Sequence, residues 1–358
     1  MTMPPMSPER RRDAAALTVE ELSDLPALDA LAPEWWTLWR SAASAATPFQ
    51  SPAWLLAWWR AFAPGGIMTL AVRDRASGGA LAGLAPLYVS DRTVRLIGVG
   101  VSDYLGLLYR DGDGKRVAAA VVEHLAHRRS AWWDVCDLFD LRPGEPLLDA
   151  PLPARAAMCR EERHGSGEPC PVLRLPAYLD DLGAHVPTRM LEKLRYYRRR
   201  LGREGGVRIE RATRENLPRL MDTLLNLHGA RWAERGEAGG VLADPRVRRL
   251  HDVAAPVLLD ADALRLYALS LDSRTVAVFY GFADRRRTYY YLGGFDPAFA
   301  RFSPGAVIVG HAIEEAVREG AAEFHFLRGG EPYKYAWGAE DRPSFRRVLS
   351  QRAAIGDE

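Results

Sequence analysis

The sequence has 358 residues, 48% of them hydrophobic, and its 48 Lys plus Arg nearly balance its 46 Asp plus Glu. This composition is typical of one large globular domain or two smaller ones, and it excludes a disordered, collagen-like or coiled-coil chain. The longest nearly apolar stretch, residues 53–63, contains Arg60 and is too short to span a membrane. The three cysteines lack CxxC spacing, so we expect neither a disulfide framework nor a metal site, and a reducing, cytoplasmic location.

The predicted elements of the first half begin after a tail at residues 1–15. Two tryptophan-rich helices are predicted at 33–40 and 51–62, the second started by Ser51 and Pro52. Hydrophobic patterning and turn residues then predict four strands, a helix and a further strand, at 68–73, 80–89, 93–99, 104–109, 115–129 and 132–139.

The second half has the same order of elements after a Pro- and Gly-rich connector at 142–176, which contains one short predicted strand at 172–175. Predicted helices lie at 188–204, 213–232, 245–259 and 303–319, and predicted strands at 207–211, 264–271, 275–283, 288–292, 324–327 and 345–349. The repeated order indicates an α/β protein with two mixed-sheet domains, at 16–141 and 177–358.

A strand–loop–helix segment at 289–310 is the first candidate binding site. Its strand ends in Gly293-Gly294, and Ser303-Pro304-Gly305 starts the next helix. The free N–H groups of a helix start favour a phosphate, and a glycine there lets the phosphate approach closely. An ordinary capped helix start explains the same pattern.

The segment 324–339, FHFLRGGEPYKYAWGA, places polar side chains directly after an apolar strand. Glu331 could serve as general base, Tyr333 as general acid, and Lys334 as a charge clamp. Lys334 stands out because only three of the 48 basic residues are lysines; the others are Lys115 and Lys193. A loop held by ion pairs of Glu331 is the alternative.

Two further groups are candidates for binding an acceptor. His228, Arg231 and Trp232 are spaced to share one helix face, and Asp103 and Tyr104 follow a strand of the first half. A packed core edge and an Asx turn, respectively, are the alternatives.

The helix at 189–204 carries seven cations against two acids. This basic face could bind the phosphates of a nucleotide, a coenzyme or RNA, or it could simply be solvated.

Several of these segments together carry a resemblance to a known family. LHGARWAERGE, YYYLGGFDPAFARFSPGAVIVG and FLRGGEPYKYAWGA resemble GNAT-superfamily acyltransferases of the CelD-like type, known from cellulose biosynthesis. That family is similar to the Fem-type peptidyltransferases. The resemblance is strong over about 189–349 and weaker over 17–139.

The resemblance implies a tandem GNAT fold and N-acyl transfer from acetyl-CoA or another acyl-CoA to an amine. It implies a donor site in the second domain at Gly293, Gly294, Ser303, Gly305 and Arg328, and it makes Glu331, Tyr333 and Lys334 the polar members of the signature loop. The family commonly has Asp where this chain has His325, which we expect to have a structural role.

Three functions are compatible with these features. The leading one is an acyl-CoA-dependent N-acyltransferase acting on a small-molecule or glycan amine, linked to polysaccharide or cell-envelope biosynthesis. The second is a Fem-like aminoacyltransferase that uses aminoacyl-tRNA, with the basic helix as its RNA contact. The third is a non-catalytic subunit of a polysaccharide synthesis assembly, suggested by the tryptophan-rich helices. We expect no DNA partner and no metal; the sequence does not specify the acceptor, the acyl-chain length or the oligomeric state.

Overall fold

The computed structural model describes residues 17–42, 46–127, 132–153, 158–165, 168–234 and 240–351. The chain forms two compact units, Met1–Gly167 together with Pro343–Glu358, and Glu168–Arg342. The tail expected at 1–15 lies outside the described residues.

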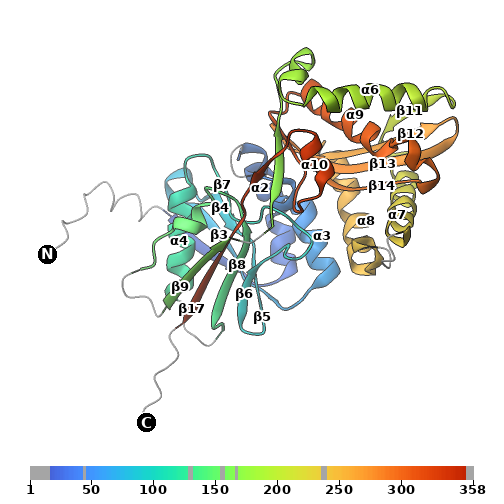
Figure 1. Ribbon diagram of the computed structural model, residues 1–358. Coiled ribbons are helices and arrows are strands. Elements are labelled where there is room, and N and C mark those ends of the chain that lie inside the picture. The colour runs from blue at the N-terminus through green and yellow to red at the C-terminus, as the bar shows by residue number, and fades with distance from the viewer. Residues whose placement is uncertain are drawn as a thin grey trace, which may run out of the picture. The chain divides into compact units, whose positions relative to one another are not determined.

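The first unit contains two sheets, an antiparallel one of four strands and a mixed one of six, in which β6 and β8 are parallel. Their strand orders are β1-β3-β4-β7 and β2-β5-β6-β8-β17-β9 (Figure 1). The elements are β1 (Leu17–Leu22), α2 (Leu25–Ser41), α3 (Pro52–Phe62), β2 (Gly66–Ile67), β3 (Thr69–Asp74), β4 (Ala80–Ala85), β5 (Leu87–Ser90), β6 (Thr93–Leu96), β7 (Leu108–Tyr109), α4 (Gly114–His127), β8 (Val135–Leu141), α5 (Pro146–Asp149), β9 (Met158–Gly165) and β17 (Phe345–Gln351).

Two predicted strands of this unit are wrong in extent. The strand predicted at 80–89 is divided by Pro86 into β4 and β5, which belong to different sheets. Proline has no N–H for a ladder hydrogen bond, so it ends one strand where the next begins. The strand predicted at 104–109 is reduced to β7, because the preceding loop holds Tyr104 and Gly106 at positive φ.

The tryptophan-rich helices α2 and α3 form as their start signals predict, although α2 begins earlier, after Asp24. The Asp24 carboxylate accepts a hydrogen bond from the Ala27 N–H, and the Ser51 hydroxyl accepts one from the Trp54 N–H. Five of the six tryptophans of these helices are buried, namely Trp35, Trp39, Trp54, Trp58 and Trp59. They are core side chains, so the observation that suggested a non-catalytic interaction subunit was misread.

A buried carboxyl group ties two loops of the first unit together. Glu145 directly precedes α5, and its Oε1 accepts a hydrogen bond from the Leu107 N–H at 3.2 Å. Burial raises the pKa of Glu145 to about 7, while the cation of Arg142 acts in the opposite direction. The native state therefore favours the protonated acid.

Glu145→Gln is expected to stabilise the protein at pH 8 and to change little at pH 5. Because the folded pKa lies above the unfolded value of about 4.5, the native state binds more protons than the unfolded state between these values, and stability falls as the pH rises through that window. Glutamine keeps an acceptor and carries no charge. Thermal unfolding at both pH values measures the effect, and Glu123→Gln on the exposed face of α4 is the control. If both variants raise the thermal midpoint equally at pH 8, ionisation of Glu145 does not destabilise the folded protein in the way proposed.

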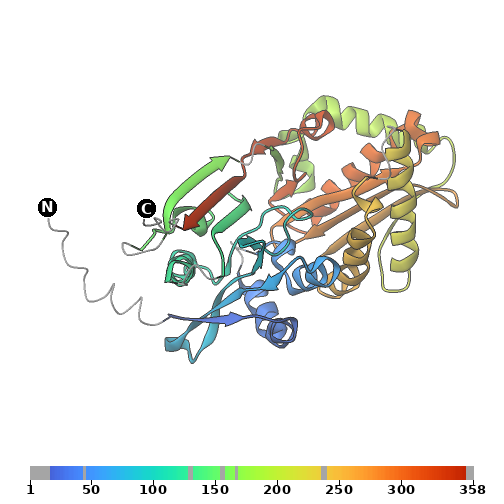
Figure 2. The same cartoon turned by 90° about the horizontal axis from the view of Figure 1, so that it is seen from below.

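The second unit is built on one seven-stranded sheet, β11-β12-β13-β14-β15-β10-β16. Its elements are β10 (Cys170–Arg174), α6 (Thr188–Leu201), β11 (Val207–Arg211), α7 (Leu217–Glu234), α8 (Pro245–Asp260), β12 (Leu264–Leu271), β13 (Arg274–Ala283), β14 (Arg287–Phe295), α9 (Pro304–Arg318), β15 (Glu323–His325), α10 (Pro332–Ala336) and β16 (Glu340–Arg342). Helices α6 and α9 lie on one face of the sheet, and α7 and α8 on the other (Figures 1 and 2).

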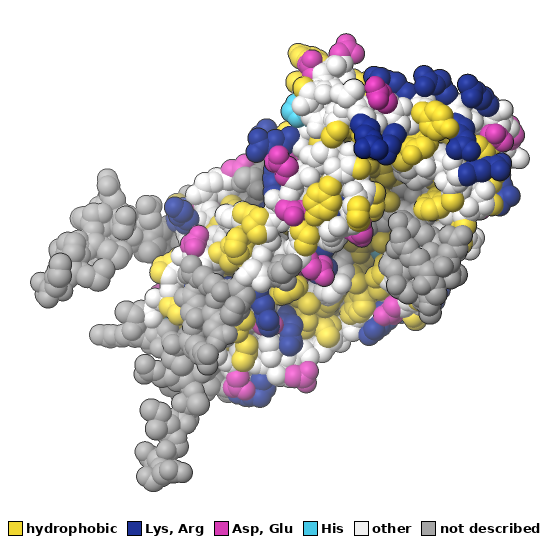
Figure 3. Space-filling model, in the orientation of Figure 1, with side chains coloured by type: hydrophobic (Ala, Val, Ile, Leu, Met, Phe, Trp, Pro, Cys, Tyr) yellow, Lys and Arg dark blue, Asp and Glu magenta, His cyan; other side chains and the backbone are white. Residues whose placement is uncertain are grey.

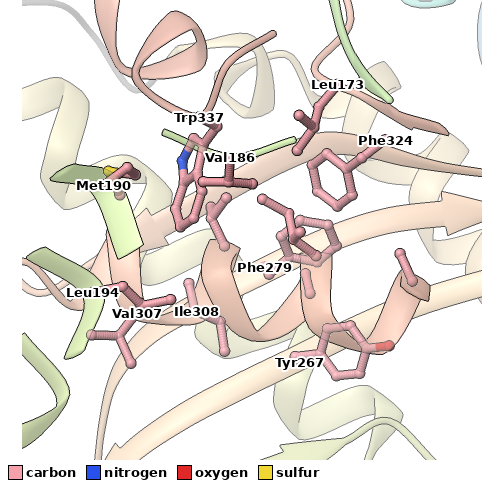
Figure 4. Packing of buried hydrophobic residues seen from close by; sticks show 14 of the residues in the cluster. Leu173, Val186, Met190, Leu194, Tyr267, Phe279, Val307, Ile308, Phe324 and Trp337 are labelled. Carbon is pink, nitrogen blue, oxygen red and sulfur yellow. The ribbon is translucent and has the colours of Figure 1, made fainter. Parts of the chain in front are cut away.

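The side chains of α6 and α9 that face the sheet pack against side chains of its strands. Leu194 of α6, Ile308 of α9, Phe279 of β13 and Phe324 of β15 belong to one buried cluster, which Trp337 closes after α10 (Figure 4). Gly310 lets the two helices approach, because a Cβ there would lie 2.7 Å from Leu194 Cδ2. The rows of apolar residues that predicted these helices therefore face this core.

The two units share a strand pattern, as the repeated element order predicted. In the first, β6 and β8 are parallel and β17 and β9 follow antiparallel; in the second, β14 and β15 are parallel and β10 and β16 follow antiparallel. Strand β17, at the end of the chain, thus lies between β8 and β9 (Figure 2). The segment 142–176 is more than a connector, since it supplies α5, β9 and β10.

Candidate functional site

The second unit contains a cavity of about 310 Å³ beside the end of β14. Side chains and backbone from α6, β13, β14, the start of α9 and α10 line it. The lining residues used below are Met190, Lys193, Tyr197, Tyr290, Gly294, Ser303, Gly305 and Tyr333.

The cavity lies where the sheet opens. The parallel pairing of β14 with β15 covers only Arg287–Tyr289 opposite Glu323–His325, and the register with β13 shifts between Tyr280 and Gly281. Beyond Tyr289, β14 has no strand neighbour on the β15 side among the described residues. Its remaining backbone therefore borders the cavity instead of a neighbouring strand.

The start of α9 is the polar end of the cavity. Ser303 occupies the N-cap position at φ +50°, and its carbonyl accepts hydrogen bonds from the Ala306 and Val307 N–H groups. A Cβ on Gly305 would meet its nearest neighbour, Phe295 Cδ1, at 3.5 Å, so the first turn is open on this side. An anion here would be stabilised by the positive end of the helix.

At Gly294, a glycine is needed for packing between a helix and the sheet, and not for access to the cavity. A Cβ on it would lie 2.5 Å from the backbone of Leu227 and His228, so its small size is what lets α7 pack on the sheet. On Gly293, a Cβ would lie 2.4 Å from the Tyr290 hydroxyl. Gly294 lines the cavity; Gly293 does not.

One cation at the cavity, Lys193, was not selected individually from the sequence, although the basic helix that carries it was a candidate for binding coenzyme phosphates. Met190, Lys193 and Tyr197 of α6 line the cavity at i, i+3 and i+7, a spacing that keeps them on one side of the helix. The sequence carried a signal, since Lys193 is one of only three lysines. A lysine on a basic helix needs no special explanation, so the sequence does not single out Lys193 from its neighbours.

The aromatic side of the cavity comes from β14 and α10. The Tyr290 ring stacks on Phe279 with centroids 4.8 Å apart, and Tyr333 is 37% exposed with its ring edge toward Tyr290. Neither a carboxylate nor an imidazole is among the lining residues, and Lys193 is their one charged group. The site therefore suits an elongated neutral group joined to an anion.

Lys334 contacts the backbone of its own loop. Its side chain is 3% exposed, and the ammonium donates to the carbonyls of Leu327 (3.2 Å), Arg328 (2.6 Å) and Gly329 (3.1 Å). It also pairs with Glu331 at 2.9 Å. The lysine holds a turn in which Leu327 and Gly329 have positive φ, and this contact set differs from the clamp on donor or acceptor that the sequence suggested.

Glu331 and Arg328 also lie outside the cavity lining. Glu331 is exposed and carries the ion pair with Lys334, which is the alternative that the sequence left open. Arg328 is half-buried. Of the four side chains proposed as functional in this loop, Tyr333 alone lines the cavity.

His228 lies on the opposite face of the sheet from the cavity. Its ring is buried under β14, with Nδ1 3.2 Å from the Gly293 carbonyl oxygen. The neighbouring His251 lies 3.0 Å from the Tyr280 hydroxyl, and burial lowers the pKa of His251 to about 3. His228 thus contacts the strand and not the cavity, and the side chains of Arg231 and Trp232 lie outside the described residues.

The other predicted acceptor residues are in the first unit. Asp103 and Tyr104 are both buried, and the adjacent Ser102 hydroxyl accepts a hydrogen bond from the Trp54 indole N–H. Tyr104 has φ +56°.

His325 has the structural surroundings expected for it. It is buried against Tyr289, and its Nε2 lies 2.9 Å from Glu323, which also pairs with Arg342. Those partners hold the pKa of Glu323 well below its usual range, whereas burial lowers the pKa of His325. Its alternation with Phe324 and Phe326 places the imidazole on the face away from the core cluster.

Within the described ranges, no group of three or more His, Cys, Asp and Glu side chains is arranged to hold a metal ion. Over the same ranges, no helix has the length and apolar character needed to cross a membrane.

Comparisons with known proteins agree with this geometry. Residues 188–335 match the family described as "Acetyltransferase (GNAT) domain". The fold of the chain is similar to that of FemX, with 12% identity over 92% of this chain and 96% of that one and a TM-score of 0.59. It is also similar to a conserved protein of unknown function from Bacteroides thetaiotaomicron, with 11% identity over 94% and 100% and a TM-score of 0.57. No curated protein matches the sequence.

The family match covers the elements that surround the cavity, from the first residues of α6 to α10. The structural similarity extends over both units and shows their fold alone. Residues 188–335 therefore match a GNAT acetyltransferase domain, which supports an acyltransferase enzyme with a two-domain GNAT-like fold.

Proposed function

We propose that the protein transfers an acyl group from an acyl-CoA to an amine, with the donor bound in the cavity of the second unit. The proposal rests on one observation: the open first turn of α9 and the side chain of Lys193 both line this cavity. The pyrophosphate would lie at Gly305 and Lys193, and the pantetheine arm along the unpaired edge of β14.

The chemical step follows from this placement. The neutral amine attacks the thioester carbonyl, forming a C–N bond while the C–S bond breaks, and backbone N–H groups of β14 stabilise the charge on oxygen. Tyr333 lines the cavity and would protonate the leaving thiolate. Glu331, the base suggested by the sequence, lies outside the lining, so the proton of the attacking amine would pass to solvent.

The charges of the lining favour an acyl-CoA over an aminoacyl-tRNA. An aminoacyl group carries an ammonium, which needs an anionic partner when it leaves water. The lining offers no carboxylate, and its one charge is the cation of Lys193. A neutral acyl group, such as acetyl, therefore fits better. The amine acceptor, the link to polysaccharide or cell-envelope synthesis and the cytoplasmic location rest on the sequence and belong to this proposal.

Gly305→Asp is expected to abolish CoA binding without unfolding the protein. The nearest atom to a Cβ at this position is 3.5 Å away, and a carboxylate in the first turn stabilises a helix. The same carboxylate would repel a phosphate. Calorimetric titration with CoA should show no detectable binding, with a thermal midpoint equal to or above that of the wild type.

Gly305→Ala is the matched control for this change, because it adds the Cβ without the charge. Unchanged CoA affinity in Gly305→Asp would place the phosphates elsewhere. An absence of CoA binding by the wild-type protein at millimolar concentration would overturn the proposed function.

A further inference from the structure

Helix α6 carries a row of cations that its own fold does not use. Four of its basic side chains and that of Arg203, just after the helix, are exposed, and among the described residues none of the five side chains makes an ion pair or hydrogen bond. We name this row the basic strip; it consists of Arg189, Lys193, Arg195, Arg199 and, just after the helix, Arg203. Figure 3 shows Lys and Arg side chains gathered along α6.

The other arginines of the helix are engaged within the fold. Arg198 forms a two-pronged ion pair with Glu314 of α9, and Arg200 donates to the Arg301 carbonyl. These contacts hold α6 in place, so the basic strip is not needed to dock the helix.

The cations of the basic strip lie close enough to one another for repulsion. Arg195, Arg199 and Arg203 repeat every four residues, where like charges on a helix repel each other. At a rise of about 1.5 Å per residue, the 14 residues of α6 span about 21 Å. A row of this length and charge would be neutralised by an extended acidic surface.

One member of the basic strip meets the cavity. Lys193 is both a member of the strip and a lining residue, next to Met190 and Tyr197. Arg195 and Arg199 point about half a turn away from these lining residues by helical spacing. A coenzyme inside the cavity would thus engage Lys193 and leave the remainder of the strip free.

We propose that the basic strip docks an acidic carrier protein that presents the acyl group as a thioester on a phosphopantetheine arm. This inference rests on the proposed function, because it needs the same cavity to accept the arm. The arm would enter past Lys193, which contacts its phosphate, while Arg195, Arg199 and Arg203 pair with carboxylates of the carrier. The reaction is unchanged: the acyl carbon leaves the sulfur of the arm for the amine nitrogen. RNA is disfavoured as the partner because the cavity offers no anion to an aminoacyl group.

The test compares a charge-reversed strip with a matched control in the full chain. The strip variant is R195E/R199E/R203E, and the control is R208E/R248E/R249E, which reverses three exposed arginines elsewhere on the second unit. The probes are an acidic acyl carrier protein loaded with an acetyl group, CoA alone and bulk tRNA, each titrated at two salt concentrations.

We expect the strip variant to bind the loaded carrier at least ten-fold more weakly than the wild type, with CoA affinity within two-fold and a shallower salt dependence. The control should resemble the wild type. If CoA binds but the carrier does not, or if both variants behave alike, the carrier inference fails and the proposed function stands. If neither CoA nor the carrier binds, the proposed function fails. Strip-dependent binding of tRNA instead would identify RNA as the partner and overturn the inference.

Discussion

Replacing Lys334 with methionine is expected to lower the free energy of unfolding by about 3 kcal/mol, because buried carbonyl groups that lose their donor cost about 1–3 kcal/mol each. The Lys334 ammonium donates to three successive carbonyls, those of Leu327, Arg328 and Gly329. Two of the three residues have positive φ, so the turn has no regular hydrogen bonding to replace the lost donor. Urea unfolding of the two proteins measures the difference.

Lys193→Met is the control, because this lysine is exposed and makes no ion pair within the described residues. Lys334→Arg should be destabilised as well, since a planar guanidinium is not equivalent to a compact ammonium in a buried site. A Lys334→Met protein with wild-type stability and no transfer activity would contradict this account and restore the direct role on substrate that the sequence suggested.

Gly294→Ala is expected to destabilise the second unit by about 2 kcal/mol or more, as inserting atoms into a packed interior typically costs 1–3 kcal/mol. The added Cβ would lie 2.5 Å from backbone atoms of Leu227 and His228, which cannot rotate away as a side chain can. Helix α7 would shift, and the contact between His228 and the Gly293 carbonyl would stretch with it. Thermal unfolding measures the loss.

Gly305→Ala provides the contrast on the other side of the cavity, with its nearest neighbour at 3.5 Å. Its stability should equal that of the wild type. Equal stability of both alanine variants would mean that α7 does not pack as closely on β14 as the structure shows.

The elements that the sequence predicts best are those with strong local signals. Strands β11 and β12 have the predicted bounds, and α8 and α9 begin where Asp-Pro and Ser-Pro mark a helix start. Within the Pro- and Gly-rich segment, the sequence predicts β10 as a strand at 172–175 but does not predict β9, because the partner that defines β9 lies far away in the chain. Strand β9 pairs with β17, almost two hundred residues later.

Part of the candidate site could be predicted from the sequence, because that part also has a strong local signal. The open helix start at Gly305 follows from local sequence, and the structure adds a cavity to it. The position of Lys193 depends on how α6 packs on α9, and the role of Lys334 depends on where the carbonyls of a turn point. Neither can be read from spacing. Tyr333 could be selected because it lies in the loop of polar and aromatic side chains that directly follows an apolar strand.

A crystal structure of the protein with bound CoA tests the central claim most directly. The account predicts pyrophosphate oxygens within hydrogen-bonding distance of the Gly305 N–H and of Lys193 Nζ, and the pantetheine arm beside Tyr290 and Gly294 with its sulfur toward Tyr333. CoA bound away from the cavity of the second unit, or a cavity that stays closed to it, would contradict the account.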